Sequence, residues 1–255
     1  MLKINGKTIT GVVYKGKRIE RIMVGGKKYY DMYDGKIIGN ALEAGSISID
    51  GKTYSYGAGY FELNIGELSG SSLNSVFCRK KISTIMHIGI DTRRITDVQQ
   101  MFYDCKSLTE LNLHGFDTRM VKNMYRMFNG IISLTTLNLG DKFDTSNVTN
   151  MQFMFWNRTL STLDLGDKFD TSNVINVNGM FQDCSSLKTI TGCLKNLCIS
   201  LSLSDCPLDH DSAMRIINGL ATVTTAQTLA LSPKTKDTLS ATEKAILINK
   251  GWTLA

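Results

Sequence analysis

Hydrophobic and polar positions recur with a fixed period between residues 90 and 190. Each unit contains a Met-Phe pair, followed by a segment in which leucines alternate with polar residues. The Met-Phe pairs begin at Met101, Met127, Met154 and Met180, so the step from one to the next is 26 or 27 residues. A period in this range predicts repeated units, each of which buries its apolar face against its neighbours.

The two halves of a unit follow different patterns. The second half reads Leu-x-x-Leu-x-Leu, and its alternation predicts a short strand with every other side chain inward. In the first half, Val148, Met151, Met154 and Phe155 are spaced as one face of a helix, and the polar residues 144–147 before them could cap its first turn. We therefore predict an α/β solenoid, a leucine-rich repeat stack with one short helix and one strand per repeat, the strands parallel and the helices on the other side.

Recurring Met, Phe and Leu positions of this kind form a hydrophobic core more often than a cofactor-binding site. We therefore assign them to the core. The predicted core positions are Met101, Phe102, Met127, Phe128, Met154, Phe155, Met180, Phe181, Leu111, Leu137 and Leu163.

Short β segments separated by X-Gly-Lys turns occupy residues 1–60, and they predict an antiparallel meander. A Gly-Lys-Thr sequence at residues 51–53 resembles the end of a phosphate-binding loop, but Ser46 stands where that motif requires glycine. We therefore interpret it as a hairpin turn. Residues 61–89 are interpreted as a first repeat that departs from the common pattern, with Val76-Phe77 in the Met-Phe position. We call it the atypical repeat.

The last part of the chain, residues 207–255, has a different pattern. Asp209 or Asp211 could cap a helix that runs to Leu220, and Ser240 to Glu243 form a capping box for a second helix that Gly251 ends. Two further segments, 228–231 and 252–254, are predicted strands. We predict three domains: the meander at 1–60, the repeats at 61–206 and a C-terminal α/β cap at 207–255.

The formal net charge of +6 is concentrated in residues 1–36, which hold nine basic and three acidic residues. The repeats therefore carry no net charge that would attract nucleic acid, and the basic residues at turns are typical of a solvated surface. The sequence has no apolar run long enough to span a membrane, and its first residues lack the apolar segment of a secretory signal.

The six cysteines do not form a metal-binding pattern, because Cys-x-x-Cys is absent and the histidines are not at ligand spacing. Cys105 and Cys184 fill the same place in repeats three steps apart, about 15 Å by strand spacing, which is too far for a disulfide. We expect buried thiols there. Pairing among Cys193, Cys198 and Cys206 stays open.

The repeats resemble leucine-rich repeat proteins of the BspA-like group, known from bacterial surface proteins and mycoplasma-type surface lipoproteins. The residues that carry the resemblance are Phe143–Met151, Met154-Phe155 and Leu160–Leu165, with near copies at 117–139 and 169–190. The resemblance covers about 90–206. It implies a leucine-rich repeat fold, and it says little about function because such repeats are scaffolds whose partners vary.

The two ends of the chain carry a second resemblance. Ile4–Lys7, Val13–Lys17 and Val24–Lys27 are similar to the starts of phage tail and baseplate proteins. The ending Asn249–Trp252 looks like the tail of similar repeat proteins from gut Bacteroidetes and their phages. These likenesses imply that residues 1–60 attach the chain to other proteins of a virion.

No nucleophile–base–acid motif is visible, so we expect no enzyme and no cofactor. We expect a non-enzymatic virion structural protein of a bacteriophage, in a tail, fibre or capsid, assembled in the bacterial cytoplasm. Its repeats would bind a protein or glycan on the host surface, and homo-oligomerisation stays open. The alternative is a BspA-like adhesin on the bacterial cell surface.

Polar residues beside the predicted strands mark the expected binding surface: Asn112, Asn138, Asp164 and Lys188. A second series, Asp91, Asp117, Asp144 and Asp170, opens each repeat. We expect each aspartate to accept backbone N–H groups of its own turn. A cation bound between the aspartates is the alternative.

Overall fold

The computed structural model describes residues 34–192 and 194–255, together with the backbone of six short strands before residue 30. Those strands are β1 (Lys3–Ile4), β2 (Lys7–Thr10), β3 (Tyr14–Lys15), β4 (Arg18–Ile19), β5 (Ile22–Val24) and β6 (Lys27–Tyr29). They pair antiparallel, in the order β1-β2-β5-β6 and as the separate pair β3-β4. Three of the expected turns, at Gly6, Gly16 and Gly25-Gly26, lie outside the described residues.

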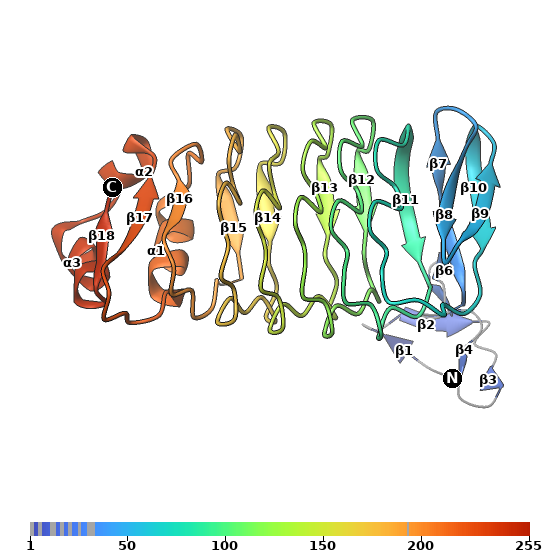
Figure 1. Cartoon of the computed structure of the whole chain (residues 1–255), viewed down its shortest axis with the longest axis horizontal. Helices are drawn as coiled ribbons and strands as arrows, with labels where there is room; N and C mark the ends of the chain where they lie inside the picture. The colour runs from blue at the N-terminus through green and yellow to red at the C-terminus, as the bar shows by residue number, and fades with distance from the viewer. Residues whose placement is uncertain are drawn as a thin grey trace.

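A mixed sheet joins the N-terminal segment to the repeats (Figure 1). Its strands β7 (Lys36–Ala41), β10 (Gly59–Asn64) and β11 (Ile82–Ile88) lie in the order β10-β7-β11 and pair antiparallel. Strands β8 (Gly45–Ile49) and β9 (Lys52–Tyr56) form the predicted hairpin, whose turn holds Asp50 and Gly51 at φ 52° and 73°. The domain boundary expected at residue 60 falls inside β10.

One short strand follows in each repeat: β12 (Glu110–Asn112), β13 (Thr136–Asn138), β14 (Thr162–Asp164), β15 (Thr189–Thr191) and β16 (Leu201–Leu203). Figure 1 shows them side by side in chain order along the long axis. Pairing is parallel from β11 through β12 to β13, and again between β14 and β15.

The prediction of an α/β solenoid with a helix in every leucine-rich repeat is wrong. In the described part of the chain the helices are α1 (His210–Gly219), α2 (Pro233–Asp237) and α3 (Ala241–Asn249), and all three follow the repeats. The strands belong to several small sheets instead of one continuous sheet.

A left-handed residue before each Met-Phe pair explains why no helix forms. These residues are Gln100, Arg126, Phe153 and Gly179, with φ of 54°, 52°, 55° and 62°. Such a residue interrupts a right-handed helix. The N–H of Met154 donates to Met151 three residues back, whereas the N–H of Phe155 donates to Met180 in the next repeat. The apolar spacing of three residues therefore comes from successive tight turns. This spacing resembles the one expected on a helix face.

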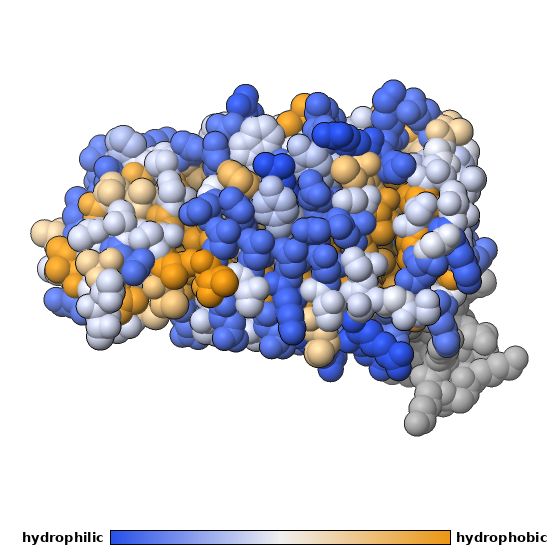
Figure 2. All heavy atoms as spheres, viewed as in Figure 1, coloured by the Kyte–Doolittle hydropathy of each residue, from blue (hydrophilic) through white to orange (hydrophobic). Residues whose placement is uncertain are grey.

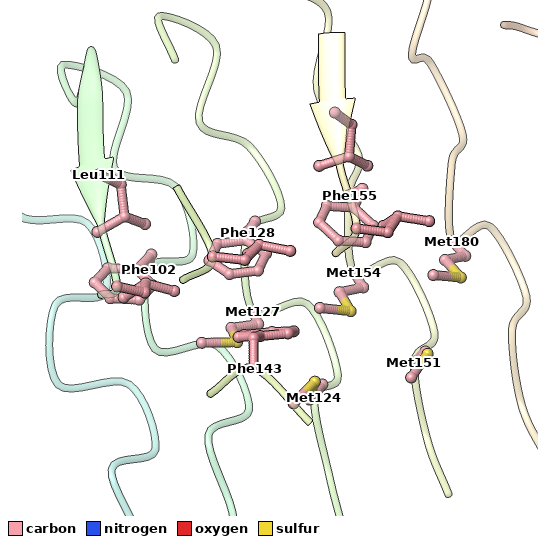
Figure 3. Close-up of a cluster of buried hydrophobic side chains, with 14 of the residues drawn as sticks. Phe102, Leu111, Met124, Met127, Phe128, Phe143, Met151, Met154, Phe155 and Met180 are labelled. Atoms are coloured by element: carbon pink, nitrogen blue, oxygen red, sulfur yellow. The ribbon is translucent and has the colours of Figure 1, made fainter. Parts of the chain in front are cut away.

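Phenylalanine rings form a continuous row through the core (Figure 3). The row runs through Phe77, Phe102, Phe128, Phe155 and Phe181, with neighbouring ring centroids between 5.3 and 5.9 Å apart and nearly parallel planes. Each such pair contributes about 0.5–1.5 kcal/mol beyond its buried area. The predicted core positions lie in this cluster, where Leu137 is partly exposed and the others are buried.

Buried threonines connect each repeat to the next at the Asp-Thr step. The hydroxyl of Thr92 donates to the C=O of Asp117 (3.0 Å) and accepts from the N–H of Asp117 (2.8 Å). The hydroxyl of Thr118 does the same for Asp144, at 2.7 Å in both directions. Thr145 and Thr171 repeat the donation one and two repeats later. The sequence shows these threonines in every unit, but their role between repeats was not predicted.

The C-terminal elements close the end of the molecule. The sheet order is β16-β17-β18, with β17 (Gln227–Leu231) and β18 (Trp252–Leu254) parallel to β16. Asp209 caps α1, and the predicted capping box of Ser240 and Glu243 begins α3. The amino group of Lys250 donates to the C=O groups of Ile217, Asn218 and Leu220, which stabilises the end of α1.

Replacement of Thr92 by valine tests the connection between repeats. Thr92→Val keeps the shape but leaves the buried N–H and C=O of Asp117 without the hydroxyl, so the free energy of unfolding should fall by about 2 kcal/mol. Urea denaturation measures the change. Thr92→Ser keeps the hydroxyl and is the control, which should lose less than half as much. An unchanged stability in Thr92→Val would remove the proposed role.

The His210–Glu243 contact predicts a pH dependence of stability. Hydrogen bonds to Asp211 and Glu243 raise the pKa of His210 above 6.5, so this contribution is complete below pH 6.5 and is lost as pH rises through the higher folded pKa. Ser240 and His210 lower the pKa of Glu243 from 4.5 to about 2, so that contribution is complete above pH 4.5 and is lost as pH falls toward 2. The difference in Tm between the natural protein and His210→Gln should therefore be largest between these limits. A difference that does not vary from pH 5 to pH 9 would contradict this.

Candidate functional site

Three of the four predicted binding residues occupy one position of the repeat. Asn112 is paired in register with Asn138, and Asp164 ends the equivalent strand β14. Lys188 lies at another position, because its N–H donates to Ser161 and the register places Thr191 opposite Asp164. The structure therefore brings Lys188 into a different row from the other three.

The asparagines at this position form a ladder of side-chain amides. The Nδ2 of Asn112 donates to the C=O of Met86 (3.1 Å), and the Nδ2 of Asn138 donates to the Oδ1 of Asn112 (3.0 Å). In the next repeat the residue is Asp164, whose Oδ1 accepts from the N–H of Gly166 (3.0 Å). A carboxylate has no N–H to donate to Asn138, so the ladder ends there.

The backbone ladder is interrupted at the same place. The N–H of Leu113 donates to Asn138 (2.8 Å), and the N–H of Leu165 donates to Thr191 (3.0 Å). Between them, the N–H of Leu139 has no backbone acceptor among the described residues, and β13 and β14 belong to different sheets. The neighbouring repeats therefore separate between these two strands.

A groove of about 660 Å³ lies at this interruption. That volume falls within the range of small-ligand sites. Its lining combines both strand ends with the two turns that follow them: His114, Leu137, Asn138, Leu139, Gly140, Asp141, Phe143, Asp164, Leu165, Gly166, Asp167 and Lys168. Of the four predicted binding residues, Asn138 and Asp164 line it, and Asn112 and Lys188 do not.

The charge of the groove is mainly negative. Asp141, Asp164 and Asp167 are exposed, and they face one lysine and one histidine in the lining. His114 lies 3.8 Å from Asp141, and both side chains are largely exposed. The groove can therefore accept hydrogen bonds from hydroxyl or cationic groups of a ligand.

Sequence reasoning missed the two Gly-Asp-Lys turns that line the groove. A signal was present, because Phe143 follows Leu139 by four positions, whereas Phe116 follows Leu113 by three. A second signal is the short spacing in the third repeat, where Leu160 follows Phe155 by five positions and the other repeats have six. These departures from the repeat mark the place where pairing is lost.

The aspartate series caps its own turns, which confirms the prediction. Asp91, Asp117, Asp144 and Asp170 each accept from the N–H two residues later, at 2.9–3.2 Å. Burial raises the pKa of Asp117, but hydrogen bonds from Arg119 outweigh it and keep that pKa below the ordinary value. In the described residues no group of three or more His, Cys, Asp or Glu could hold a metal ion.

The cysteines in the described ranges are free thiols. Cys105 and Cys184 do occupy equivalent places, since each donates to the C=O of a phenylalanine in the preceding repeat at 2.8 Å. Burial raises the pKa of Cys105 to about 12, so it is not a reactive thiolate. Cys198 and Cys206 are also free, and Cys193 lies outside the described residues.

Part of the chain matches a family model. Residues 71–192 match the family described as "Mycoplasma protein of unknown function, DUF285". The matched segment is similar to this family and runs from within the atypical repeat to the residue after β15. The comparisons with curated proteins and with solved structures gave no match.

The surface over the repeats is predominantly hydrophilic on the face drawn in Figure 2, with hydrophobic areas toward both ends of the molecule. None of the helices within the described ranges is long and apolar enough to cross a bilayer.

Asp164→Asn should extend the amide ladder by one repeat. The new Nδ2 can donate to Asn138 as Asn138 donates to Asn112, so the free energy of unfolding should rise by about 1 kcal/mol. Chemical denaturation measures this change. Asp164→Ala removes the same charge without adding a donor and is the matched control. An equal effect of both substitutions would mean that charge, not the ladder, controls stability here.

Proposed function

We propose that this chain is a non-enzymatic recognition protein that binds a protein or glycan on a bacterial surface through the groove between β13 and β14. The groove at the interrupted ladder is the observation that carries the proposal. It combines the N–H of Leu139, which has no backbone acceptor among the described residues, with a volume suited to a small part of a larger ligand.

The chemistry of the groove favours hydrogen-bond donors on the ligand. The amides of Asn112 and Asn138 are engaged in their own ladder. Asp141 and Asp167 lie on turns, line the groove and are exposed. Sugar hydroxyls and the basic side chains of a protein both fit such acceptors.

We further propose that the protein is a structural component of a bacteriophage virion, in a tail, fibre or capsid. The likeness of residues 1–60 to phage tail and baseplate proteins supports attachment of this segment to other virion proteins. In this arrangement the repeats face outward, and their groove meets the host surface. An adhesin on the bacterial cell surface is the alternative, and it would use the same groove.

Binding of the fluorescent protein to bacterial cells tests the proposal. The natural protein should bind cells of a host strain, and the double substitution Asp141→Asn with Asp167→Asn should weaken binding about tenfold, because two acceptor charges are lost. Periodate or protease treatment of the cells tells a glycan from a protein ligand. Asp237→Asn, an exposed aspartate in α2, is the matched control and should bind normally.

Failure to bind any host strain, or equal binding by the double variant, would contradict the groove as the recognition site. Mass spectrometry of purified virions and of cell envelopes determines whether the protein is located in the virion or in the bacterial envelope. Presence in virions supports the phage proposal. Presence in envelopes alone would replace it with the adhesin.

A further inference from the structure

Arg126 lies among aromatic rings from three consecutive repeats. Its guanidinium carbon is 5.0 Å from the ring centroid of Tyr125, 5.3 Å from that of Phe153 and 5.7 Å from that of Tyr103. All four side chains are partly exposed. We call these four residues the arginine–aromatic cluster. The distances are those of cation–π contacts.

Unlike four other arginines of the repeats, Arg126 has no acidic partner within the described residues. Arg93, Arg119 and Arg158 each bind a carboxylate at 2.6–2.9 Å, and Arg79 lies 3.5 Å from Asp104. Arg126 forms no such ion pair within the described residues. Its Nε atom is buried and has no hydrogen-bond partner. A guanidinium has five N–H donors, and since Nε is buried, binding of an anion falls to the four N–H groups on the two Nη atoms.

The backbone around the cluster holds Arg126 in a fixed place. Arg126 has φ of 52°, and its N–H donates to Gln152 in the next repeat (3.0 Å). The N–H of Phe153 donates in turn to Asn178 (3.0 Å), and the N–H of Tyr125 donates to the side chain of Asn123 (3.1 Å). Hydrogen bonds between neighbouring repeats therefore fix the backbone that carries the side chains of the cluster.

We infer that the arginine–aromatic cluster binds a carboxylate-bearing sugar, such as a uronic or sialic acid, in a surface glycan. The planar guanidinium suits a carboxylate, which it can bind through two parallel N–H groups. Tyr103 also has Arg79 over its ring, at 5.5 Å from the centroid, so the apolar contact to the C–H face of a pyranose ring falls to the partly exposed ring of Tyr125. The inference rests on the proposed function, since it gives the recognition protein a second contact with a surface glycan, outside the acidic groove.

An acidic sugar fits this surface better than an acidic peptide. A bound peptide gains much of its affinity from backbone hydrogen bonds to its receptor. Here the N–H groups of Tyr125, Arg126 and Phe153 are all engaged within the protein. What the cluster offers is one cation without an acidic partner in the described residues and a partly exposed tyrosine ring, which match one carboxylate on a sugar ring.

Calorimetric titration with defined oligosaccharides tests the inference. The probes are trigalacturonic acid, 3′-sialyllactose, and two neutral counterparts, the methyl ester of trigalacturonic acid and lactose. At least one acidic probe should bind about tenfold or more tightly than its neutral counterpart, since the counterpart lacks the charge-assisted hydrogen bonds. Because this comparison uses the natural protein, it does not depend on how any variant folds.

Substitution of Arg126 locates the binding. Arg126→Met should lower the affinity for the acidic probe about tenfold or more, and Arg126→Lys should recover part of it, because lysine keeps the charge but loses the planar fork. Arg94→Met is the matched control, since Arg94 is exposed and the change in net charge is the same. Its affinity should stay within about twofold.

Three results would overturn the inference: no binding of either acidic probe, equal binding of acidic and neutral probes, or equal binding by Arg126→Met. A hexaglutamate peptide that binds as tightly as the acidic sugars would replace the glycan with an acidic protein segment. If cells still bind the protein through the groove in any of these cases, the proposed function stands and this inference alone fails.

Discussion

Hydrogen bonds between neighbouring repeats are the interaction on which the rest of this structure depends. In the turn segments, alternate backbone N–H groups donate to the next repeat, as Phe102 does to Met127 and Phe128 to Met154. A buried N–H that loses its partner costs about 1–3 kcal/mol. A single repeat therefore cannot satisfy its own backbone, and the buried threonines and stacked phenylalanines add side-chain contacts along the same direction.

The same dependence makes any departure from the repeat visible. Asp164 stands where asparagine would continue the amide ladder, and the third repeat has a shorter spacing before Leu160. The N–H of Leu139 loses its acceptor there, and a groove with exposed carboxylates is present. Arg126 departs from the pattern in another way. Aromatic rings surround it, and it lacks an acidic partner such as the one that Asp117 provides for Arg119. Both proposed binding sites lie where the repeated pattern is broken.

Local patterns were the part of the fold that the sequence predicted well. Asp50-Gly51 predicted a hairpin, Ser240 with Glu243 predicted a capping box, and Phe77 was correctly aligned with Phe102. The helix expected around Met151 and Met154 was wrong, because an apolar spacing of three fits both a helix and successive tight turns. The left-handed residue that decides between them can be arginine or phenylalanine, types that do not signal it. Of the predicted binding residues, Asn138 and Asp164 meet in the groove, but the loss of strand pairing that forms it depends on contacts between repeats.

Amide hydrogen exchange at three equivalent leucines tests most directly whether the ladder is interrupted at the groove. Leu113 and Leu165 each donate to the next strand, and Leu139 has no backbone acceptor in the described part of the chain. We expect the amide of Leu139 to exchange at least about ten times faster than the other two in the native protein. Equal protection at all three positions would mean that β13 and β14 are paired, and it would contradict the groove and the function proposed for it.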